Sequence, residues 1–384
     1  MSLIAAALAG CGGSDDSSAS GGSLDAVASL GQKIFDDESL SSSGRMSCST
    51  CHLADAAHST GTDTLVVPPG GPNLATPGFR NSPSLRYLNA NPAFFFDGEG
   101  TPTGGFNRDG RVDTRQAQAQ RAFLSPHEMD NGTAEAFVAR LRQASYADEF
   151  QRVFGSTIFD SADNAFASAR LAVQKFQQDD VRFQPFDSKF DQFLAGDATL
   201  SERELRGLAL FNDPTKGNCA ACHPSTRGAD GSPPMFTDFT YDNLGVPRNP
   251  DIPANADPNY FDLGLCGPFR TDLAARTDLC GAFKVPTLRN VALTAPYFHN
   301  GRFKTLREVV AFYVRRDTHP EQFYPLKADG TVNKFDDLPA QYHANVNVTE
   351  PPYDRRPGQA PRMNDDEIDL VVEFLHTLTD GYRP

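Results

Sequence analysis

Two five-residue stretches of the chain share one pattern: "CSTCH" (residues 48–52) and "CAACH" (residues 219–223). The pattern C-x-x-C-H is the attachment motif of c-type haem. Its spacing lets two thiols add to the vinyl groups on one porphyrin edge, and the adjacent histidine becomes an axial ligand of the iron. A chain with 7 Cys and 8 His contains the pattern by chance roughly 0.003 times. We therefore predict two covalently attached haems.

A zinc site is the alternative interpretation of these motifs. Four cysteines could share one zinc ion: Cys48, Cys51, Cys219 and Cys222. Such a site does not require a histidine directly after each cysteine pair. The haem interpretation uses both histidines, His52 and His223, as axial ligands, so it accounts for the whole pattern.

Each haem motif closes a longer stretch that occurs twice. In "SLGQKIFDDESLSSSGRMSCSTCH" and "LRGLALFNDPTKGNCAACH", a glycine is followed four residues later by phenylalanine, then by a polar loop and the motif. The matching pairs are Gly31 with Phe35 and Gly207 with Phe211. A supersecondary unit used twice predicts two similar domains related by an internal repeat.

Helical periodicity dominates the rest of the chain, and strand signals are sparse. Residues 162–178 and the segment that starts at Asn364 have apolar residues at helical spacing, and Asn364 with Glu367 forms a capping pair. We therefore predict a mainly α protein with two c-type cytochrome domains, each with one covalently bound haem. A boundary at "LAGDATLSERE" gives domains at 24–196 and 197–384.

The overall charge limits the kinds of partner. The chain has 35 basic and 49 acidic residues, a net charge of -14, and no basic run. These features argue against nucleic acid or an anionic membrane surface as a partner. The 31 glycines and 28 prolines predict long irregular stretches, which a large cofactor would hold in place.

Residues 1–23 resemble a bacterial lipoprotein export signal followed by a flexible tether. A short apolar run ends in "LAGC", and a Gly/Ser/Asp tract with no means of folding follows. Cys11 would carry the lipid. The run is not preceded by Lys or Arg, and it is too short to span a bilayer. The expected location is the periplasm or cell envelope, with a lipid anchor.

Two cysteines remain after these assignments. In an oxidising compartment Cys266 and Cys280 would pair, and closing their loop is worth ~3 kcal/mol in the chain-entropy model. The alternative is two unrelated buried thiols.

Several stretches beside the haem motifs resemble one family. They are "FRNSPSLRYL", "FFFDG", "QAQRAFLSPHEM", "FKVPTLRNVALTAPYFHNG" and "TLREVVAFY". These stretches are similar to segments of the dihaem bacterial cytochrome c peroxidases and their MauG branch, over nearly the whole chain after the tether. The resemblance implies an enzyme that reacts with hydrogen peroxide at its first haem.

The resemblance assigns catalytic residues to the first haem. A glutamine and a glutamate ten residues apart line its distal pocket in this family, and here they are Gln118 and Glu128. Glu128 would be the general acid-base that moves a proton between the two peroxide oxygens. Where classical peroxidases have a histidine that caps this haem, the chain has Asn73, which implies an open iron face. The nearby His58 is interpreted as a surface residue.

The resemblance also implies a calcium site and a ligand for the second haem. The calcium ligands would be the Asn81 side chain and the backbone carbonyls of Thr294 and Pro296, all oxygen donors as a hard cation requires. Nineteen residues after Thr294 stands Tyr313, in an amphipathic segment where most tyrosines are core residues. The peroxidases have methionine there, and MauG has tyrosine. A phenolate favours the higher oxidation states of iron, so a His223/Tyr313 haem is suited to storing an oxidising equivalent.

One position departs from the family pattern. The family has a tryptophan between the haems, where "FFFDG" puts Phe96, and the chain has no Trp. Since phenylalanine is not readily oxidised, charge would pass between the haems by direct tunnelling or through tyrosines such as Tyr87 or Tyr297.

Three functions are compatible with these residues. The segments "RRDTHPEQFYP" and "GLCGPF" look most like MbnH-like dihaem enzymes, which implies a peroxide-dependent oxidase. It would oxidise a residue, tryptophan to kynurenine, on a small exported copper-binding protein (MbnP-like) by long-range electron transfer. The second function is a dihaem cytochrome c peroxidase that takes electrons from a small c-type cytochrome or cupredoxin, which predicts methionine in place of Tyr313. The third, a non-enzymatic electron carrier, leaves Gln118 and Glu128 without a role.

Overall fold

The computed structural model describes residues 24–61 and 65–384, and these residues are mostly helical, as predicted. The helices are α1 (Ala26–Asp36), α2 (Cys48–Cys51), α3 (Arg115–Leu124), α4 (Ala134–Leu141), α5 (Ala147–Phe154), α6 (Ala162–Asp179), α7 (Lys189–Ala195), α8 (Glu202–Asn212), α9 (Leu306–Arg315) and α10 (Asp365–His376). Two short antiparallel pairs complete the fold, β1 (Phe95–Phe96) with β2 (Pro102–Thr103) and β3 (Tyr241–Asp242) with β4 (Phe283–Lys284). Cys11 and the predicted signal and tether lie outside the described residues. Across the described ranges, no helix has the length and apolar character needed to cross a membrane.

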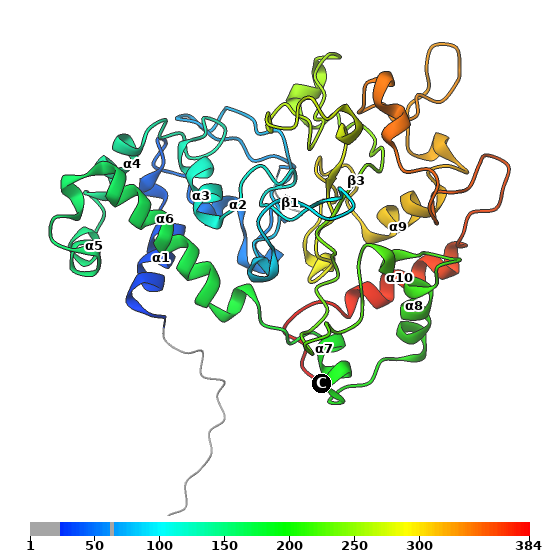
Figure 1. Cartoon of the computed structure of the whole chain (residues 1–384), viewed down its shortest axis with the longest axis horizontal. Coiled ribbons are helices and arrows are strands. Elements are labelled where there is room, and N and C mark those ends of the chain that lie inside the picture. Colours follow the sequence, from blue (N-terminus) through cyan, green and yellow to red (C-terminus); the bar gives the residue numbers. More distant parts are fainter. Residues whose placement is uncertain (1–23, 62–64) are drawn as a thin grey trace, which may run out of the picture.

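Helices α1 and α6 cross in the part of the molecule nearer the N-terminus (Figure 1). Asp25 caps α1 by accepting a hydrogen bond from the Ala28 N–H (2.7 Å). The crossing point is Gly31, where a Cβ atom would lie 1.9 Å from the carbonyl oxygen of Ala172 on α6. Only glycine allows two backbones to approach this closely.

Helices α8 and α10 cross in the same way in the C-terminal part (Figure 1). A Cβ atom on Gly207 would lie 2.1 Å from the Leu370 carbonyl oxygen. The predicted capping pair of α10 is present, since the Asn364 side chain accepts from the Glu367 N–H (2.9 Å). The glycine that precedes each haem motif therefore serves the same kind of helix crossing.

Three hydrophobic clusters form the core. One contains buried residues between Leu30 and Phe183, the second contains buried residues between Phe190 and Leu378, and a smaller third contains buried residues between Val246 and Val346. Phe190 belongs to α7 and packs against Phe374 (5.5 Å between ring centroids). The predicted boundary after residue 196 would therefore separate α7 from the cluster into which it packs.

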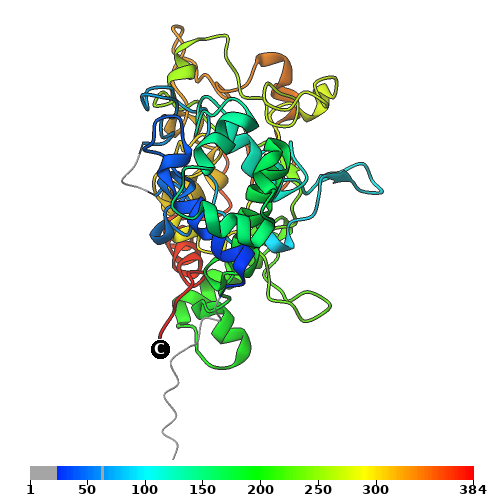
Figure 2. The ribbon, with the colours of Figure 1, turned by 90° about the vertical axis from the view of Figure 1, so that its left-hand side faces the viewer.

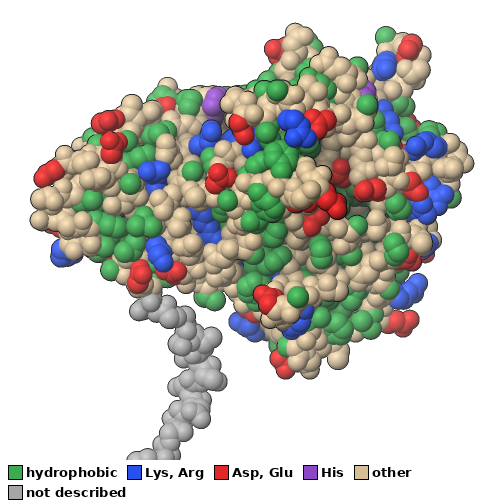
Figure 3. Space-filling view, in the orientation of Figure 1, with side chains coloured by type: hydrophobic (Ala, Val, Ile, Leu, Met, Phe, Trp, Pro, Cys, Tyr) green, Lys and Arg blue, Asp and Glu red, His purple; other side chains and the backbone are tan. Residues whose placement is uncertain are grey.

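Loops with only short strands and 3₁₀ turns make up residues 213–305. In the N-terminal part, the β1–β2 hairpin projects from the body of the molecule, where Phe95 and Phe96 are exposed (Figure 2). On the face shown in Figure 3, acidic and basic side chains are interspersed. The irregular stretches bring residues from distant parts of the chain around two cavities.

Candidate functional site

The first haem motif lies in the wall of a cavity. Cys48, Cys51 and His52 line this cavity, and both thiols are free. The short helix α2 positions them and is closed at its N-terminus by a reciprocal capping box. The His52 ring donates from Nδ1 to the His58 carbonyl oxygen (2.9 Å), so Nε2 carries no proton and can bind a metal. The cavity lined by Cys48, Cys51 and His52 is called the first cavity below.

His58 is buried, and its sequence interpretation as a surface residue was wrong. Only 4% of its surface is exposed, and its ring stacks on Phe183 (4.2 Å between centroids). Burial, and then the charge of Arg86, lower the pKa of His58 to about 4. The left-handed backbone at Ala57 and His58 turns the chain sharply here. His58 therefore supports the axial histidine through its carbonyl and lies outside the cavity wall.

Gln118 and Glu128 line the first cavity, from α3 and from the loop after it. The Gln118 amide donates to Asn107 Oδ1 (3.2 Å). Glu128 is accessible through the cavity that it lines. Burial within the protein raises the pKa of its carboxyl, and nearby cations, led by Arg111, oppose the rise. Asn73, at the position of the capping histidine, is exposed and outside the cavity wall.

A glycine loop holds the backbone beside Glu128. The Gly71 N–H donates to the Glu128 carbonyl oxygen (3.1 Å). A Cβ atom on Gly70 would lie 2.3 Å from the His127 carbonyl, so only glycine fits there. His127 also lines the cavity, and its Nδ1 donates to the Pro77 carbonyl oxygen (2.8 Å). Sequence reasoning missed His127, although it directly precedes Glu128.

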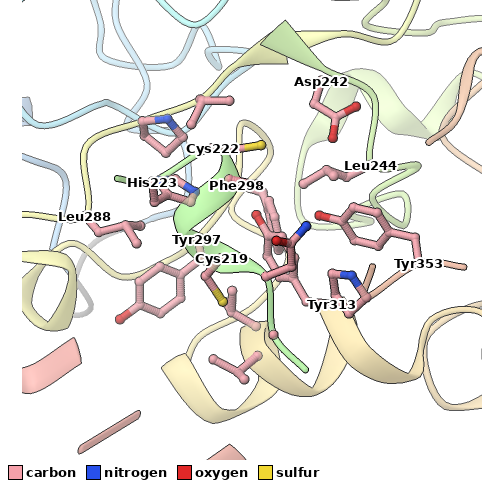
Figure 4. Close-up of a pocket in the computed structure, with 18 of the residues that line it drawn as sticks. Cys219, Cys222, His223, Asp242, Leu244, Leu288, Tyr297, Phe298, Tyr313 and Tyr353 are labelled. Atoms are coloured by element: carbon pink, nitrogen blue, oxygen red, sulfur yellow. The ribbon is translucent and has the colours of Figure 1, made fainter. Parts of the chain in front are cut away.

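The second haem motif lines a separate cavity (Figure 4). Cys219 and Cys222 are free thiols in its wall. The His223 ring donates from Nδ1 to the Phe236 carbonyl oxygen (2.8 Å), which repeats the arrangement at His52. The second histidine is therefore also held with Nε2 available to a metal.

Two tyrosines lie across the second cavity from His223 (Figure 4). Tyr313 is on α9, which a Thr305–Glu308 capping box starts. Tyr353 packs beside it, with 5.8 Å between ring centroids. Burial raises the pKa of both hydroxyls. Sequence reasoning missed Tyr353, because it stands in the irregular stretch "EPPYDRR", which has no periodicity.

Cationic side chains without carboxylate partners line both cavities. Their charge tests whether haem, which is anionic, fits these cavities. Arg108 and Lys284 form no ion pair within the described ranges. Lys284 Nζ donates only to neutral oxygens, Asn91 Oδ1 (2.8 Å) and the Gly105 carbonyl (2.6 Å), and burial lowers its pKa to about 7. Arg115 is buried with no hydrogen-bond partner for Nη1. Buried cations require anions, and haem carries two carboxylate side chains. The cavities therefore fit haem by charge as well as by their thiols and histidines.

Phe96 does not lie between the cavities, contrary to the prediction. It belongs to the projecting hairpin, is 37% exposed and packs against Phe94 (5.4 Å between centroids). Pairing of β1 with β2 carries this strand outward, and Phe96 lines neither cavity. The frame Phe-x-x-Asp-Gly occurs twice, in "FFFDG" and in "FNRDG". The second frame contains Arg108, which lines both cavities.

Two of the three residues expected to bind calcium, Asn81 and Pro296, are in contact. Asn81 is buried, its Nδ2 donates to the Pro296 carbonyl oxygen (2.5 Å), and its Oδ1 has no partner within the described residues. Thr294 is two residues before Pro296. A buried amide oxygen without a partner is the kind of neutral donor that a hard cation accepts. The described ranges hold no group of three His, Cys, Asp or Glu residues that could bind a metal, so such a site would use neutral oxygens.

Cys266 and Cys280 form a disulfide, with their Cα atoms 5.0 Å apart. The bonded segment runs beside β4, since the Leu265 N–H donates to the Ala282 carbonyl oxygen (3.0 Å). The disulfide therefore stabilises the loop that leads into the wall of the second cavity.

Two cavities that each combine a C-x-x-C-H motif with an available histidine define the class of dihaem redox proteins. The family model described as di-haem cytochrome c peroxidase (CCP_MauG) matches residues 25–199. The methylamine utilization protein MauG of Paracoccus denitrificans is 33% identical over 371 residues, which cover 94% of this chain and 90% of MauG. The diheme peroxidase BthA from Burkholderia thailandensis has a similar structure, with a TM-score of 0.85 and 36% identity over 96% of this chain and 89% of BthA. A MauG-like protein associated with microbial copper homeostasis has a TM-score of 0.64 and 27% identity, over 94% of this chain and 91% of that protein.

The chain therefore belongs to the di-haem cytochrome c peroxidase and MauG family, as its motifs predicted. It is an oxidoreductase that acts with peroxide, and it has the dihaem peroxidase fold. Membership of this family implies two c-type haems as cofactors.

Proposed function

We propose that this protein is a peroxide-dependent oxidase of the MauG type, which withdraws electrons from a residue of a partner protein. The observation that carries the proposal is Tyr313, which faces the second cavity opposite His223. A tyrosinate ligand is hard and anionic, and it favours oxidised iron, whereas the methionine of an electron-accepting haem raises the potential. The second cavity is therefore suited to holding an oxidising equivalent that a partner protein then receives.

The residues that line the two cavities have different proposed roles. Haem, when bound, supplies the iron that reacts with peroxide and stores the oxidising equivalents. His52 and His223 would each bind an iron through Nε2. Glu128, as a carboxylate, accepts the first proton of peroxide and returns it to the oxygen that leaves as water. Gln118, ordered by its bond to Asn107, orients the peroxide through its amide.

Covalent attachment of both haems is part of the proposal. The two pairs of free thiols support it: Cys48 with Cys51, and Cys219 with Cys222. We further propose two cytochrome c domains related by an internal repeat, with α7 assigned to the second. The matching crossings of α1 with α6 and of α8 with α10 support this division. Haem that stays on the chain in a denaturing gel would support attachment, and loss of haem there would contradict it.

A calcium ion is proposed between the Asn81 side chain and the carbonyls of Thr294 and Pro296. The buried Asn81 Oδ1 without a partner supports it, as does the contact of the Asn81 amide with the Pro296 carbonyl. Removal of calcium by a chelator should lower the melting temperature of the holoprotein, because the cation would hold an orphaned buried oxygen. Asn81→Ala should abolish the response to chelator, and a full response in that variant would contradict the assignment.

The proposed partner is a small exported copper-binding protein, MbnP-like, in which tryptophan is oxidised to kynurenine. The structural similarity to a MauG-like protein associated with microbial copper homeostasis supports this choice. We propose that the reaction takes place in the periplasm or cell envelope, with Cys11 as the lipid-bearing residue.

A dihaem cytochrome c peroxidase is the second candidate function. It would reduce hydrogen peroxide with electrons from a small c-type cytochrome or cupredoxin. The greater similarity to the diheme peroxidase BthA (36% identity) than to the copper-homeostasis protein (27% identity) favours it. Tyr313 in the second cavity is the observation that weighs against it.

One experiment distinguishes the two functions. Stoichiometric peroxide is added to the holoprotein, and the visible and near-infrared spectra are followed with and without a candidate partner or reduced cytochrome c. A long-lived oxidised spectrum that the partner protein discharges supports the proposal. Rapid turnover with reduced cytochrome c favours the peroxidase, and absence of any response contradicts both functions.

A further inference from the structure

Arg108 occupies the wall that the two cavities share. It lines both of them, which no other described residue does. Its carbonyl oxygen accepts a hydrogen bond from the Lys284 N–H on β4 (2.9 Å), and Lys284 lines the second cavity. Its Nε donates to the carbonyl oxygen of Asn81 (3.0 Å), which lines the first cavity. Arg108 is therefore held in place from both sides.

The charge of Arg108 is not neutralised by the protein. Its neighbours Arg80 and Arg111 both pair with Asp109, at 2.8 and 2.9 Å. Arg108 forms no ion pair within residues 24–61 and 65–384. Burial, and then the charge of Arg80, lower its pKa to about 10, so the guanidinium remains protonated at neutral pH. A buried positive charge without a counterion requires an anion from elsewhere.

We propose that Arg108 is an electrostatic anchor shared by the two cavities, which pairs with carboxylate side chains of both haems and raises the reduction potential of both irons together. The inference rests on the two-haem site proposed above. A positive charge near an iron stabilises the added electron, and the effect is strong where water is excluded. The wall between the two cavities would then hold a charge that couples the two centres electrostatically.

Two other cations provide matched controls because each lines one cavity only. Arg121 lines the first cavity, and Lys284 lines the second. At a pH below 7, where Lys284 is mainly protonated, removing either charge should act mainly on the nearer haem, since the Coulomb interaction falls with distance. Loss of Arg108 should differ from both controls by acting on the two haems alike.

The test measures the midpoint potential of each haem by spectroelectrochemistry in holoprotein variants with verified haem content. Arg108→Gln is expected to lower the reduction equilibrium constant of both haems about tenfold, or ~59 mV for a one-electron couple. Arg108→Lys keeps the charge and is expected to leave both potentials near their wild-type values. Arg121→Gln and Lys284→Gln should each shift mainly one haem.

The inference is overturned if Arg108→Gln shifts the midpoint potential of only one haem or of neither. It is also overturned if Arg108→Lys lowers the potentials as far as Arg108→Gln does. Where Arg108→Gln does not take up two haems, Arg108→Lys decides: unchanged potentials support the inference, and a fall in either overturns it. The reaction of the wild-type protein with peroxide is measured separately. A wild-type protein that does not react contradicts the proposed function, and the potentials test Arg108 independently of that result.

Discussion

The two cavities are alike around their histidines and differ on the opposite wall. In each, a histidine donates from Nδ1 to a backbone carbonyl, at 2.9 Å for His52 and 2.8 Å for His223. The first cavity has a volume of about 740 Å³ and presents Glu128 on the opposite wall, whereas the second has about 190 Å³ and presents Tyr313. Similar attachment sites are therefore compatible with different chemistry, and the opposite wall decides which chemistry each supports.

This difference supports the separate task that we propose for each cavity. A carboxyl with a raised pKa in the wall of the first cavity can exchange protons with a small molecule such as peroxide. In the second cavity Tyr313 offers an anionic ligand instead, with Tyr353 packed beside it. The comparison therefore supports our proposal that peroxide reacts at the first site and that the second stores oxidising equivalents.

The largest expected effect comes from Glu128→Gln, which removes the acid-base group of the first cavity alone. The rate of reaction with peroxide should fall by ~10²- to 10⁴-fold, the usual contribution of a general acid-base. Stopped-flow absorbance measures this rate. Glu135→Gln, on the exposed face of α4, is the control and should react like the wild type. Equal rates for the two variants would remove the proposed difference between the cavities.

Tyr313→Phe should change the second cavity alone. If Tyr313 is the ligand that we propose, its loss should leave one of the two haems high-spin by electron paramagnetic resonance. Tyr353→Phe is the matched control, because it removes a neighbouring hydroxyl from the same cavity. If Tyr353→Phe gives the high-spin signal and Tyr313→Phe does not, the ligand assignment passes to Tyr353.

The pH dependence sharpens the role of the first cavity. Because burial raises the pKa of Glu128 above its ordinary value of 4.5, the carboxylate form is lost at a higher pH than for an exposed glutamate. Accepting a proton needs the carboxylate, so the peroxide rate should fall about tenfold per pH unit below the raised pKa and level off above it. The peroxide rate of Glu128→Gln should not show this fall at low pH. A midpoint at or below 4.5 in the wild type would contradict the assignment.

The smallest effect is expected from Gly70→Ala. The added Cβ would meet the His127 carbonyl at 2.3 Å, so the backbone beside Glu128 must shift. Overpacking of this kind costs ~1–3 kcal/mol, and it should lower the melting temperature and slow the peroxide reaction less than Glu128→Gln does. Gly98→Ala is the control, because a Cβ there meets nothing within 4 Å. A Gly70→Ala variant that matches this control would show that the glycine loop does not position Glu128.

Local patterns predicted the elements whose causes are local. The helix expected over residues 162–178 is α6 (Ala162–Asp179), and the Asn364–Glu367 cap is present. Periodicity and capping depend on neighbours within a turn or two of the helix, so a single sequence contains the necessary information. The family also followed from short motifs, since they carry the chemistry that its members share.

Predictions that depended on which residues are neighbours in space were wrong at several positions. His58 looked like a surface residue because nothing in the sequence shows that its ring stacks on Phe183. Phe96 was expected between the haems because nothing in the sequence shows that the pairing of β1 with β2 carries it outward, away from both cavities. The packing of Phe190 against Phe374 likewise moved α7 to the C-terminal core.

The sequence by itself determined the mainly helical class, the two haem motifs and the dihaem peroxidase and MauG family, because these depend on residue types at fixed spacing. Only the tertiary structure decided which residues share a wall. It set Arg108 between the cavities, Tyr353 beside Tyr313 and His127 beside the glycine loop. The physical reason is that a cavity is enclosed by long loops whose course depends on packing between distant segments, and no local pattern records that packing.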